Sequence, residues 1–432
     1  MKELFNFNHH NRKTLKEPKL GKQTFLTENT KRVQSFEKFI KEVYERETDD
    51  KPLYTGRYLI TITDDNTFDK AYKLFESKLG FKVASSNDFK NEEITESKIK
   101  NVDALIYEEL GVALVSGEED QIQILESVSN GFIIEPERIV YVPDDAPATL
   151  NTPSTWGINV TNVINSKYTG KNVKVAILDT GFDLSHPDFN GRQIFSSSFV
   201  TNEAVQDLHG HGTHCVGTAC GDKDLHNQRY GVAKDSIIYV GKVLSNEGSG
   251  AQSWILSAIT WAVNNGCKVI SMSLGSPVFP GQGYDFAYER AAQFALSKGC
   301  VVIAAAGNES RRSWNQFRPV GSPADCPSIL AVAALDSNLN VADFSNRSIN
   351  PTGQIDIASA GVMVYSSWPM PARYRTISGT SMATPHVAGI VALLWEKFPK
   401  ATPYQISNEL KNIARRLPLQ SIDVGLGLSI AP

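Results

Sequence analysis

The sequence lacks the features of several large protein classes. Its longest apolar segment, His386 to Trp395, is far shorter than the roughly 18 residues that a membrane span needs. The 43 Lys and Arg residues nearly balance the 47 Asp and Glu residues, so neither nucleic acid nor a membrane is expected as a partner. At 432 residues, the chain is long enough for two or three globular domains.

Cysteine is also scarce, and a secretory signal is not evident. The five cysteines are an odd number and show no metal-ligand spacing, so neither a disulfide framework nor a zinc cluster is expected. The first twenty residues mix Asn, His, Arg and Lys where a signal peptide would have an unbroken apolar stretch. We expect a cytoplasmic protein, or one that is exported without a leader.

Composition divides the chain into four parts. Residues 1–53 form a polar, basic arm and an amphipathic helix. Residues 54–142 follow the order β-α-β-β-α-β of a small α+β (ferredoxin-like) domain, and residues 143–155 have the composition of a linker. In residues 156–432, continuous Val/Ile/Ala runs alternate with helical segments, which indicates an α/β fold, a doubly wound parallel sheet with helices on both faces.

The hydrophobic pattern also predicts individual elements. In the smaller domain we expect strands at 57–63, 81–84, 104–115 and 132–142, and helices at 68–79 and 118–128. In the larger domain we expect strands at 173–178, 237–240, 269–272, 301–306 and 329–334, and helices at 251–264 and 286–297.

Four polar residues stand where such a sheet presents side chains to a cleft. Asp179 ends the run VKVAILD, His211 lies in the glycine-flanked GHGTH, Asn308 follows VVIAAAG, and Ser381 lies at the start of a helix. Singly, each has an ordinary explanation as a turn, a loop residue or a helix cap. Together they supply what acyl transfer needs: a nucleophile, an imidazole base, a carboxylate that orients the base, and an oxyanion donor.

The segments around these four residues resemble the subtilisin-like serine proteases, including the proteinase K branch. The resemblance covers residues 153–432 and includes KNVKVAILDTGFDLSHPDF, HGHGTHCVGT, VVIAAAGNES and SGTSMATPHVAG. It implies a triad of Asp179, His211 and Ser381, with Asn308 as the oxyanion donor. It also implies endopeptidase cleavage of protein or peptide substrates through an acyl-enzyme. We expect the enzyme to act as a monomer.

The resemblance further implies how a substrate binds. One segment would pair with the substrate backbone as an edge strand, and two segments would form the walls of the P1 pocket. Because these walls are small and apolar, we expect a preference for a bulky hydrophobic P1 residue. The edge is Gly248, Ser249 and Gly250; the walls are Ser273, Leu274 and Gly275, and Ala304, Ala305, Ala306 and Gly307.

The smaller domain resembles the propeptide of this family, by pattern and position more than by identical residues. This resemblance implies that the chain is a zymogen, in which the prodomain inhibits the protease and is then removed autocatalytically. Matching Trp156-Gly157 with the aromatic-glycine pair near the family's mature N-terminus places the cleaved bond between Leu150 and Asn151.

Members of the family bind structural calcium through oxygen ligands, whereas catalysis needs no cofactor. Asp188 matches one family ligand. A second candidate site combines Asp356 with the carbonyl oxygens of Pro327 and Ile329.

Two alternative functions stay open. His209, His211 and His214 have the His-x-His-x-x-His spacing of binuclear zinc hydrolases, although that set lacks an acidic ligand and leaves Ser381 and Asn308 unexplained. The second alternative is that the chain is a catalytically silent member of the fold that only binds partners.

Overall fold

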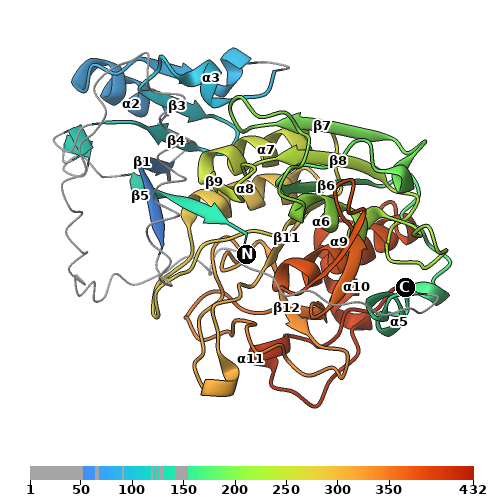
Figure 1. Ribbon diagram of the computed structural model, residues 1–432. Helices are drawn as coiled ribbons and strands as arrows, with labels where there is room; N and C mark the ends of the chain where they lie inside the picture. The colour runs from blue at the N-terminus through green and yellow to red at the C-terminus, as the bar shows by residue number, and fades with distance from the viewer. Residues whose placement is uncertain are drawn as a thin grey trace.

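A computed structural model describes residues 52–63, 68–89, 92–117, 121–122, 124–125, 131–142 and 154–432 (Figure 1). The predicted N-terminal arm and amphipathic helix, and the Leu150–Asn151 bond, lie outside the described residues. Within the described part of the chain, no helix is both long and apolar enough to cross a membrane.

A seven-stranded sheet forms the centre of the C-terminal unit, residues 154–432. Its order is β13-β12-β11-β10-β6-β8-β7, and all neighbouring strands are parallel. The five central strands consist almost entirely of buried residues, as expected for a sheet covered on both faces. The strands are β6 (Lys174–Asp179), β7 (Ile194–Ser198), β8 (Ile237–Lys242), β10 (Val269–Met272), β11 (Val301–Ala305), β12 (Leu330–Leu335) and β13 (Ile357–Ala360).

The predicted α/β fold of this unit is confirmed. Its five predicted strands correspond to β6, β8, β10, β11 and β12, and their ends agree within two residues. The edge strands β7 and β13 were not predicted, because their sequences, IFSSS and IASA, contain no long apolar run.

Helices cover both faces of the sheet (Figure 1). Helices α7 (Gln252–Asn264) and α8 (Phe286–Ser297), both predicted, share one apolar core with the first face. Helices α6 (His211–Cys220) and α9 (Thr380–Lys397) share a second core with the other face. The remaining elements are α5 (Trp156–Val160), η4 (Val163–Asn165), η5 (Pro187–Phe189), η6 (Arg312–Trp314), α10 (Pro403–Ile413), α11 (Ser421–Val424) and the hairpin of β14 (Val364–Ser367) and β15 (Tyr374–Ile377).

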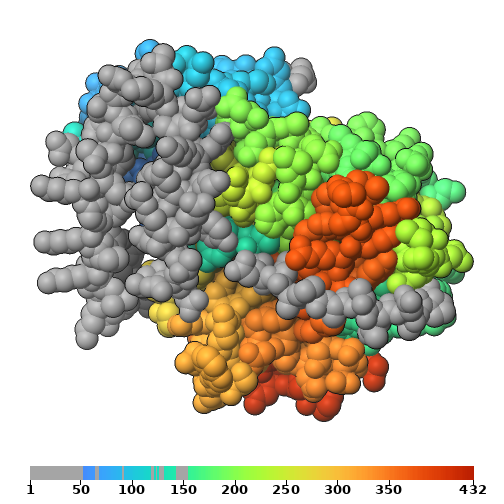
Figure 2. All heavy atoms as spheres, viewed as in Figure 1, coloured from blue at the N-terminus to red at the C-terminus, as the bar shows by residue number. Residues whose placement is uncertain are grey.

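The N-terminal unit, the described part of residues 52–142, is built on a second sheet. Its order is β2-β3-β4-β1-β5, and β5 also pairs with β9 of the C-terminal unit. In Figure 2 the blue spheres of this unit abut green spheres of the C-terminal unit. The elements are β1 (Leu53–Ile62), α2 (Phe68–Lys73), η2 (Leu74–Lys78), β2 (Val83–Ser85), η3 (Ser86–Phe89), α3 (Glu96–Ile99), β3 (Ala104–Tyr107), β4 (Val112–Val115), β5 (Phe132–Tyr141) and β9 (Ser249–Ala251).

The prediction of one strand over 104–115 is wrong. Strands β3 and β4 form an antiparallel hairpin in which Tyr107 pairs with Val112, and the chain reverses at Gly111, whose φ of +65° suits glycine. Apolar residues on both sides of this turn are buried, which made the run look continuous. Strands β3, β4, β1 and β5 keep the ferredoxin-like order, and the predicted strand at 81–84 is the short edge strand β2.

Candidate active site

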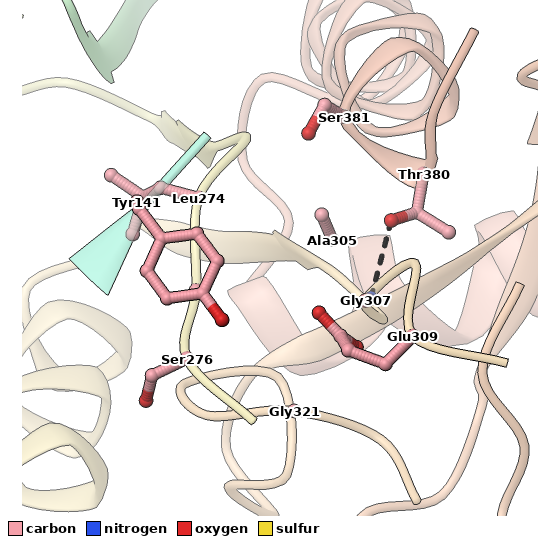
Figure 3. Close-up of a pocket in the computed structure, with 10 residues that line it drawn as sticks. Tyr141, Leu274, Ser276, Ala305, Gly307, Glu309, Gly321, Thr380 and Ser381 are labelled. Atoms are coloured by element: carbon pink, nitrogen blue, oxygen red, sulfur yellow. Dashed lines mark hydrogen bonds between the residues drawn. The ribbon is translucent and has the colours of Figure 1, made fainter. Parts of the chain in front are cut away.

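Ser381 lies at the N-terminus of α9, as the sequence predicted, and borders a pocket (Figure 3). Its hydroxyl donates a hydrogen bond to the carbonyl oxygen of Ser273 over 3.1 Å. The Ser273 hydroxyl in turn donates to the carbonyl oxygen of Ser381 over 2.8 Å. These two bonds tie the start of α9 to the segment that follows β10.

Asn308 is held next to Ser381 by Thr380. The Thr380 backbone N–H and hydroxyl donate to Asn308 Oδ1 over 2.9 and 2.7 Å. Because both bonds engage the amide oxygen, they orient the side chain and leave its Nδ2 group available as a donor. A Cβ at Gly379 would lie only 3.1 Å from this nitrogen, so the glycine keeps the space beside it open.

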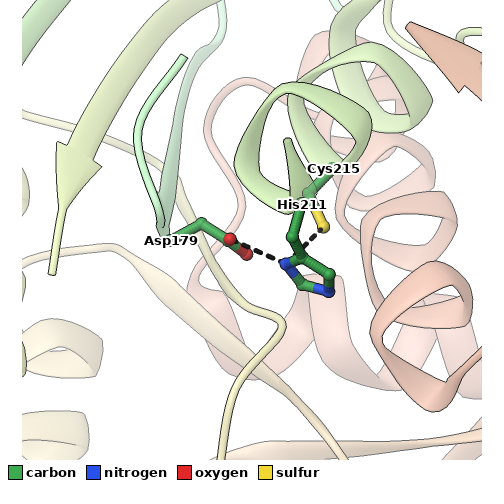
Figure 4. A group of neighbouring side chains, drawn as sticks. All are labelled: Asp179, His211 and Cys215. Atoms are coloured by element: carbon green, nitrogen blue, oxygen red, sulfur yellow. Dashed lines mark hydrogen bonds and ion pairs between the residues drawn. The ribbon is translucent and has the colours of Figure 1, made fainter. Parts of the chain in front are cut away.

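Asp179 and His211 are in direct contact (Figure 4). Asp179 is the last residue of β6 and His211 the first of α6, and Asp179 Oδ1 lies 2.7 Å from His211 Nδ1 with both side chains buried. A carboxylate accepts hydrogen bonds, so the neutral ring carries its proton on Nδ1 and leaves Nε2 as an acceptor. Burial disfavours the charged ring, but Asp179 outweighs this effect and raises the pKa of His211 well above its usual value.

Cys215 connects the two halves of the site. Its sulfur lies 3.8 Å from His211 Nδ1 and 3.7 Å from the carbonyl oxygen of Ser381. His211 and Ser381 therefore border the same small region. His211 Nε2 has no hydrogen-bond partner among the described residues, because the Ser381 hydroxyl is turned toward Ser273.

Asp207 fixes the start of α6, a role that the sequence analysis missed. Its Oδ1 accepts from the backbone N–H groups of His209 and Gly210, and its Oδ2 accepts from the Thr213 backbone N–H over 2.8 Å and from the Thr213 hydroxyl over 2.7 Å. An acidic residue a few positions before a helix start was the available signal. By capping the helix, Asp207 positions His211 against Asp179.

The pocket beside Ser381 contains only part of the predicted walls. Leu274, Gly275, Ala305 and Gly307 line it. The predicted wall residues Ser273, Ala304 and Ala306 do not. Ser273 bonds to Ser381 instead, while Ala304 and Ala306 pack into the core shared with α7 and α8, because alternate strand residues face opposite sides of the sheet. Further lining residues, which the sequence analysis did not identify, are Tyr141, Ser276, Glu309, Gly321 and Thr380.

The predicted substrate edge is paired with a strand of the N-terminal unit. In β5, Val140 pairs with Gly250 and Tyr141 with Ser249, and the Val142 N–H donates to the carbonyl oxygen of Gly248 over 3.0 Å. On its other side, Tyr141 exchanges two backbone hydrogen bonds with Gly275, of 3.0 and 3.4 Å. We call this position of β5, between Gly248–Ala251 and Gly275, the strand track.

The residues predicted to bind calcium do not fit that ion. Asp188 accepts from Arg373 Nη2 over 2.9 Å and from the hydroxyls of Tyr230 and Tyr374. Asp356, the carboxylate grouped with the carbonyls of Pro327 and Ile329, lies 2.6 Å from the ammonium group of Lys411. A calcium ion at either carboxylate would have to displace a cationic side chain that already neutralises it.

The histidines of the zinc hypothesis do not converge either. His214 is buried, its Nε2 bonds to the carbonyl oxygen of Val364 over 3.0 Å, and burial lowers the pKa of its ring to about 3. Among the described residues, the only set of three potential metal ligands that gathers is Asp179, His211 and Cys215.

Comparison with known proteins identifies the family. Residues 170–427 match the model of the subtilase family, which covers more than half of the chain. The chain belongs to the subtilase family. It is a serine endopeptidase, a hydrolase, with the subtilisin-like α/β fold.

Several subtilisins are similar to this subtilase. Subtilisin from Bacillus pumilus is 42% identical over 254 residues, which span 58% of this chain and 86% of that protein. Subtilisin E from Bacillus subtilis (strain 168) is 42% identical over 254 residues, 58% of this chain and 62% of that protein. M-protease from Shouchella clausii (strain KSM-K16) is 41% identical over 286 residues, 65% of this chain and 70% of that protein.

Proposed function

We propose that Ser381, His211, Asp179 and Asn308 catalyse peptide-bond hydrolysis in this subtilase. The observation that carries the proposal is the buried 2.7 Å contact between Asp179 and His211, at the end of β6 and the start of α6. In the reaction, Ser381 Oγ attacks the substrate carbonyl while His211 Nε2 takes its proton, and His211 returns that proton to the leaving amine. Water then hydrolyses the acyl-enzyme by the same route.

The reaction begins with a rotation of the Ser381 side chain. Its hydroxyl now bonds to the Ser273 carbonyl, whereas the acceptor that it needs, His211 Nε2, has no partner among the described residues. Rotation about Cα–Cβ exchanges one acceptor for the other. Catalytic hydrogen bonds that are poorly formed in a free enzyme commonly form when substrate binds.

The oxyanion would be stabilised by two donors of different origin. Asn308 Nδ2 is oriented by the bonds of its amide oxygen to Thr380. The Ser381 N–H lies in the first turn of α9, where backbone N–H groups have no partner within the helix and the helix dipole favours negative charge.

The substrate would bind as an extended strand in the strand track, with its P1 side chain in the pocket beside Ser381. Leu274 and Ala305 give this pocket apolar walls, which supports a preference for a bulky hydrophobic P1 residue. Glu309 adds a carboxylate to the lining, so a long basic P1 side chain would be the next best substrate.

The N-terminal unit acts as a prodomain that inhibits the enzyme, because β5 fills the strand track. We propose that the chain cuts itself within the predicted linker, residues 143–155, at Leu150–Asn151. While Ile139–Val142 occupies the track, Leu150 and the residues before it cannot pair there, so β5 must leave the track before this bond is cleaved.

Two experiments test this function. The purified chain should hydrolyse peptides, resist chelators and lose activity with a serine-directed phosphonyl reagent, and Ser381→Ala should remove activity. A native chain as inactive as Ser381→Ala would establish the catalytically silent alternative. Intact-mass analysis should show an N-terminus at Asn151 in active material. The Ser381→Ala chain should remain uncleaved. Intact-mass analysis of cell and medium fractions tests the proposed site of action, in the cytoplasm or after export. Light scattering of the purified enzyme tests the proposed monomeric state.

A further inference from the structure

We propose that the C-terminal unit contains a pocket for an arginine side chain of the substrate, formed by Asp285, Asp325 and the carbonyl oxygen of Pro277. In the structure, Arg138 of β5 occupies this pocket. The inference rests on the proposed endopeptidase function and extends it, because it places a determinant of specificity far from the P1 pocket.

Arg138 is buried between the two units. Its Nε lies 3.9 Å from Asp285 Oδ2, and its Nη1 donates to the carbonyl oxygen of Pro277 over 3.4 Å. Its side chain is only 6% exposed, although it carries a full charge. A buried guanidinium requires compensating acceptors, and Asp285 and Pro277, which contact it, belong to the C-terminal unit. Asp285 and Asp325 also contribute more than Tyr54 and Glu135 of the N-terminal unit to raising the pKa of Arg138.

The pocket contains more negative charge than one arginine uses. Asp285 is 1% exposed, and its Oδ1 accepts from the Tyr288 N–H at the start of α8. Asp325 is 3% exposed, and its Oδ2 has no hydrogen-bond partner among the described residues. Burial raises the pKa of Asp325 to about 7, and Asp285 adds to this effect, whereas Arg138 opposes it. Without a cation, the two buried carboxylates would repel each other.

Arg57, a second buried arginine at the contact between the units, differs from Arg138 in that its carboxylate partner belongs to its own unit. Its Nε lies 2.6 Å from Glu137 Oε2, and both residues belong to the N-terminal unit. When the N-terminal unit leaves, Arg57 and Glu137 leave together and their charges remain matched. Arg138 leaves Asp285 and Asp325 behind, so the mature enzyme retains an acidic pocket.

The position of the pocket relates it to substrate. Arg138 lies three residues before Tyr141, which pairs with Gly275 in the strand track. In a substrate that follows the same track, one residue pairs with Gly275. The residue three positions before it would then reach the arginine pocket. Asp285 and the Pro277 carbonyl engage two different nitrogens of Arg138, Nε and Nη1, which suits the fixed fork of a guanidinium better than a lysine ammonium.

Fluorogenic peptides test the proposal on the mature enzyme. A single arginine is moved through positions from about four to about eight residues before the cleaved bond, and each peptide is compared with its alanine and lysine counterparts. We expect arginine to raise kcat/KM by about tenfold at one position only, mainly through a lower KM, as for one net charge-assisted interaction. Lysine at that position should give less than half of this gain.

The matched variants identify the pocket. Asp325→Asn should reduce the arginine-to-alanine ratio to less than about threefold, whereas Asp343→Asn, which removes an equal charge from an exposed position, should keep it. The ratio within each variant is independent of the fraction of folded enzyme. A flat arginine profile in the wild-type enzyme, or an unchanged ratio in Asp325→Asn, would overturn the inference. Failure to cleave any of these peptides would instead contradict the proposed function.

Discussion

The two units of this subtilase differ in where they obtain their core. The C-terminal sheet has an apolar core on each face, and one of the two consists of residues of that unit alone. The N-terminal unit has a small core of its own, but its other face, including Leu59 and Tyr107, joins the core formed by α7 and α8. The core that belongs to the C-terminal unit alone is much larger than the one that belongs to the N-terminal unit alone, so we expect the N-terminal unit to depend more on docking. Substitutions at the catalytic end should change turnover, and substitutions at the contact should change docking.

Asp179→Asn should have the largest effect and should leave docking intact. An amide cannot hold His211 with its proton on Nδ1 or stabilise the charged ring, so we expect kcat to fall about 10⁴-fold. Turnover of a peptide by the mature enzyme measures the loss, and thermal unfolding of the full chain checks the fold. If kcat fell by less than tenfold, the proposed role of Asp179 would be wrong.

Glu137→Ala should weaken docking and leave the turnover of the mature enzyme unchanged. Glu137 is fully buried and accepts from Arg57, from the Thr55 hydroxyl and from the Ser253 N–H at the start of α7. Its removal would leave Glu96 as the remaining carboxylate partner of the buried Arg57 guanidinium, at a cost of up to about 3–5 kcal/mol. In an uncleaved Ser381→Ala background, hydrogen exchange should become faster throughout the N-terminal unit and remain unchanged in β10 and β11. Equal loss of protection in both units would contradict the comparison.

Part of this architecture was readable from the sequence. The apolar runs placed Asp179, Asn308 and Ser381 at one edge of a parallel sheet, because the carboxyl ends of parallel strands meet there. The sequence did not show which alternate residues before Gly307 face the pocket and which face the core. Ala304 and Ala306 were therefore predicted to line the pocket, although they face the core.

Long-range partners were the other limit. Asp188 accepts a hydrogen bond from Arg373, 185 residues away, and Asp285 forms an ion pair with Arg138 of the other unit. No local pattern encodes such pairs, since they arise only when the loops and the docking register are fixed. The resemblance suggested Asp188 as a calcium ligand by position, but it could not reveal that Arg373 and Lys411 pair with Asp188 and Asp356.

The contact between the units should also respond to pH through Glu135. Burial, followed by the repulsion of Asp285, raises the pKa of Glu135 to about 9, while the Phe286 N–H and Arg138 oppose this rise. The docked carboxyl therefore keeps a proton that the undocked carboxyl, with an ordinary pKa, loses. Through Glu135, docking therefore binds a proton between these two pKa values. This contribution should weaken docking as pH rises from about 5 to 9, by up to about tenfold per pH unit.

Protease protection of the uncleaved Ser381→Ala chain at several pH values measures this dependence. Glu135→Gln, which is neutral at every pH and similar in shape, should flatten the profile in this range. Glu76→Gln, on the surface of the N-terminal unit, serves as the control and should keep it. If Glu135→Gln made protection fall more steeply with pH, or left the profile unchanged, the sign derived from Glu135 would be contradicted.

The smallest expected effect is that of a chelator on the C-terminal unit. Arg373 and Lys411 already neutralise Asp188 and Asp356, so removal of calcium should shift the unfolding midpoint by less than about 2 °C. Lys411→Met should lower the midpoint more than the chelator does, because it leaves the Asp356 carboxylate without its cation. If added calcium raised the midpoint of the wild-type chain by many degrees, an ion would be stabilising this unit at Asp188, at Asp356 or elsewhere. The stability of the C-terminal unit would then depend on a bound metal as well as on its apolar cores.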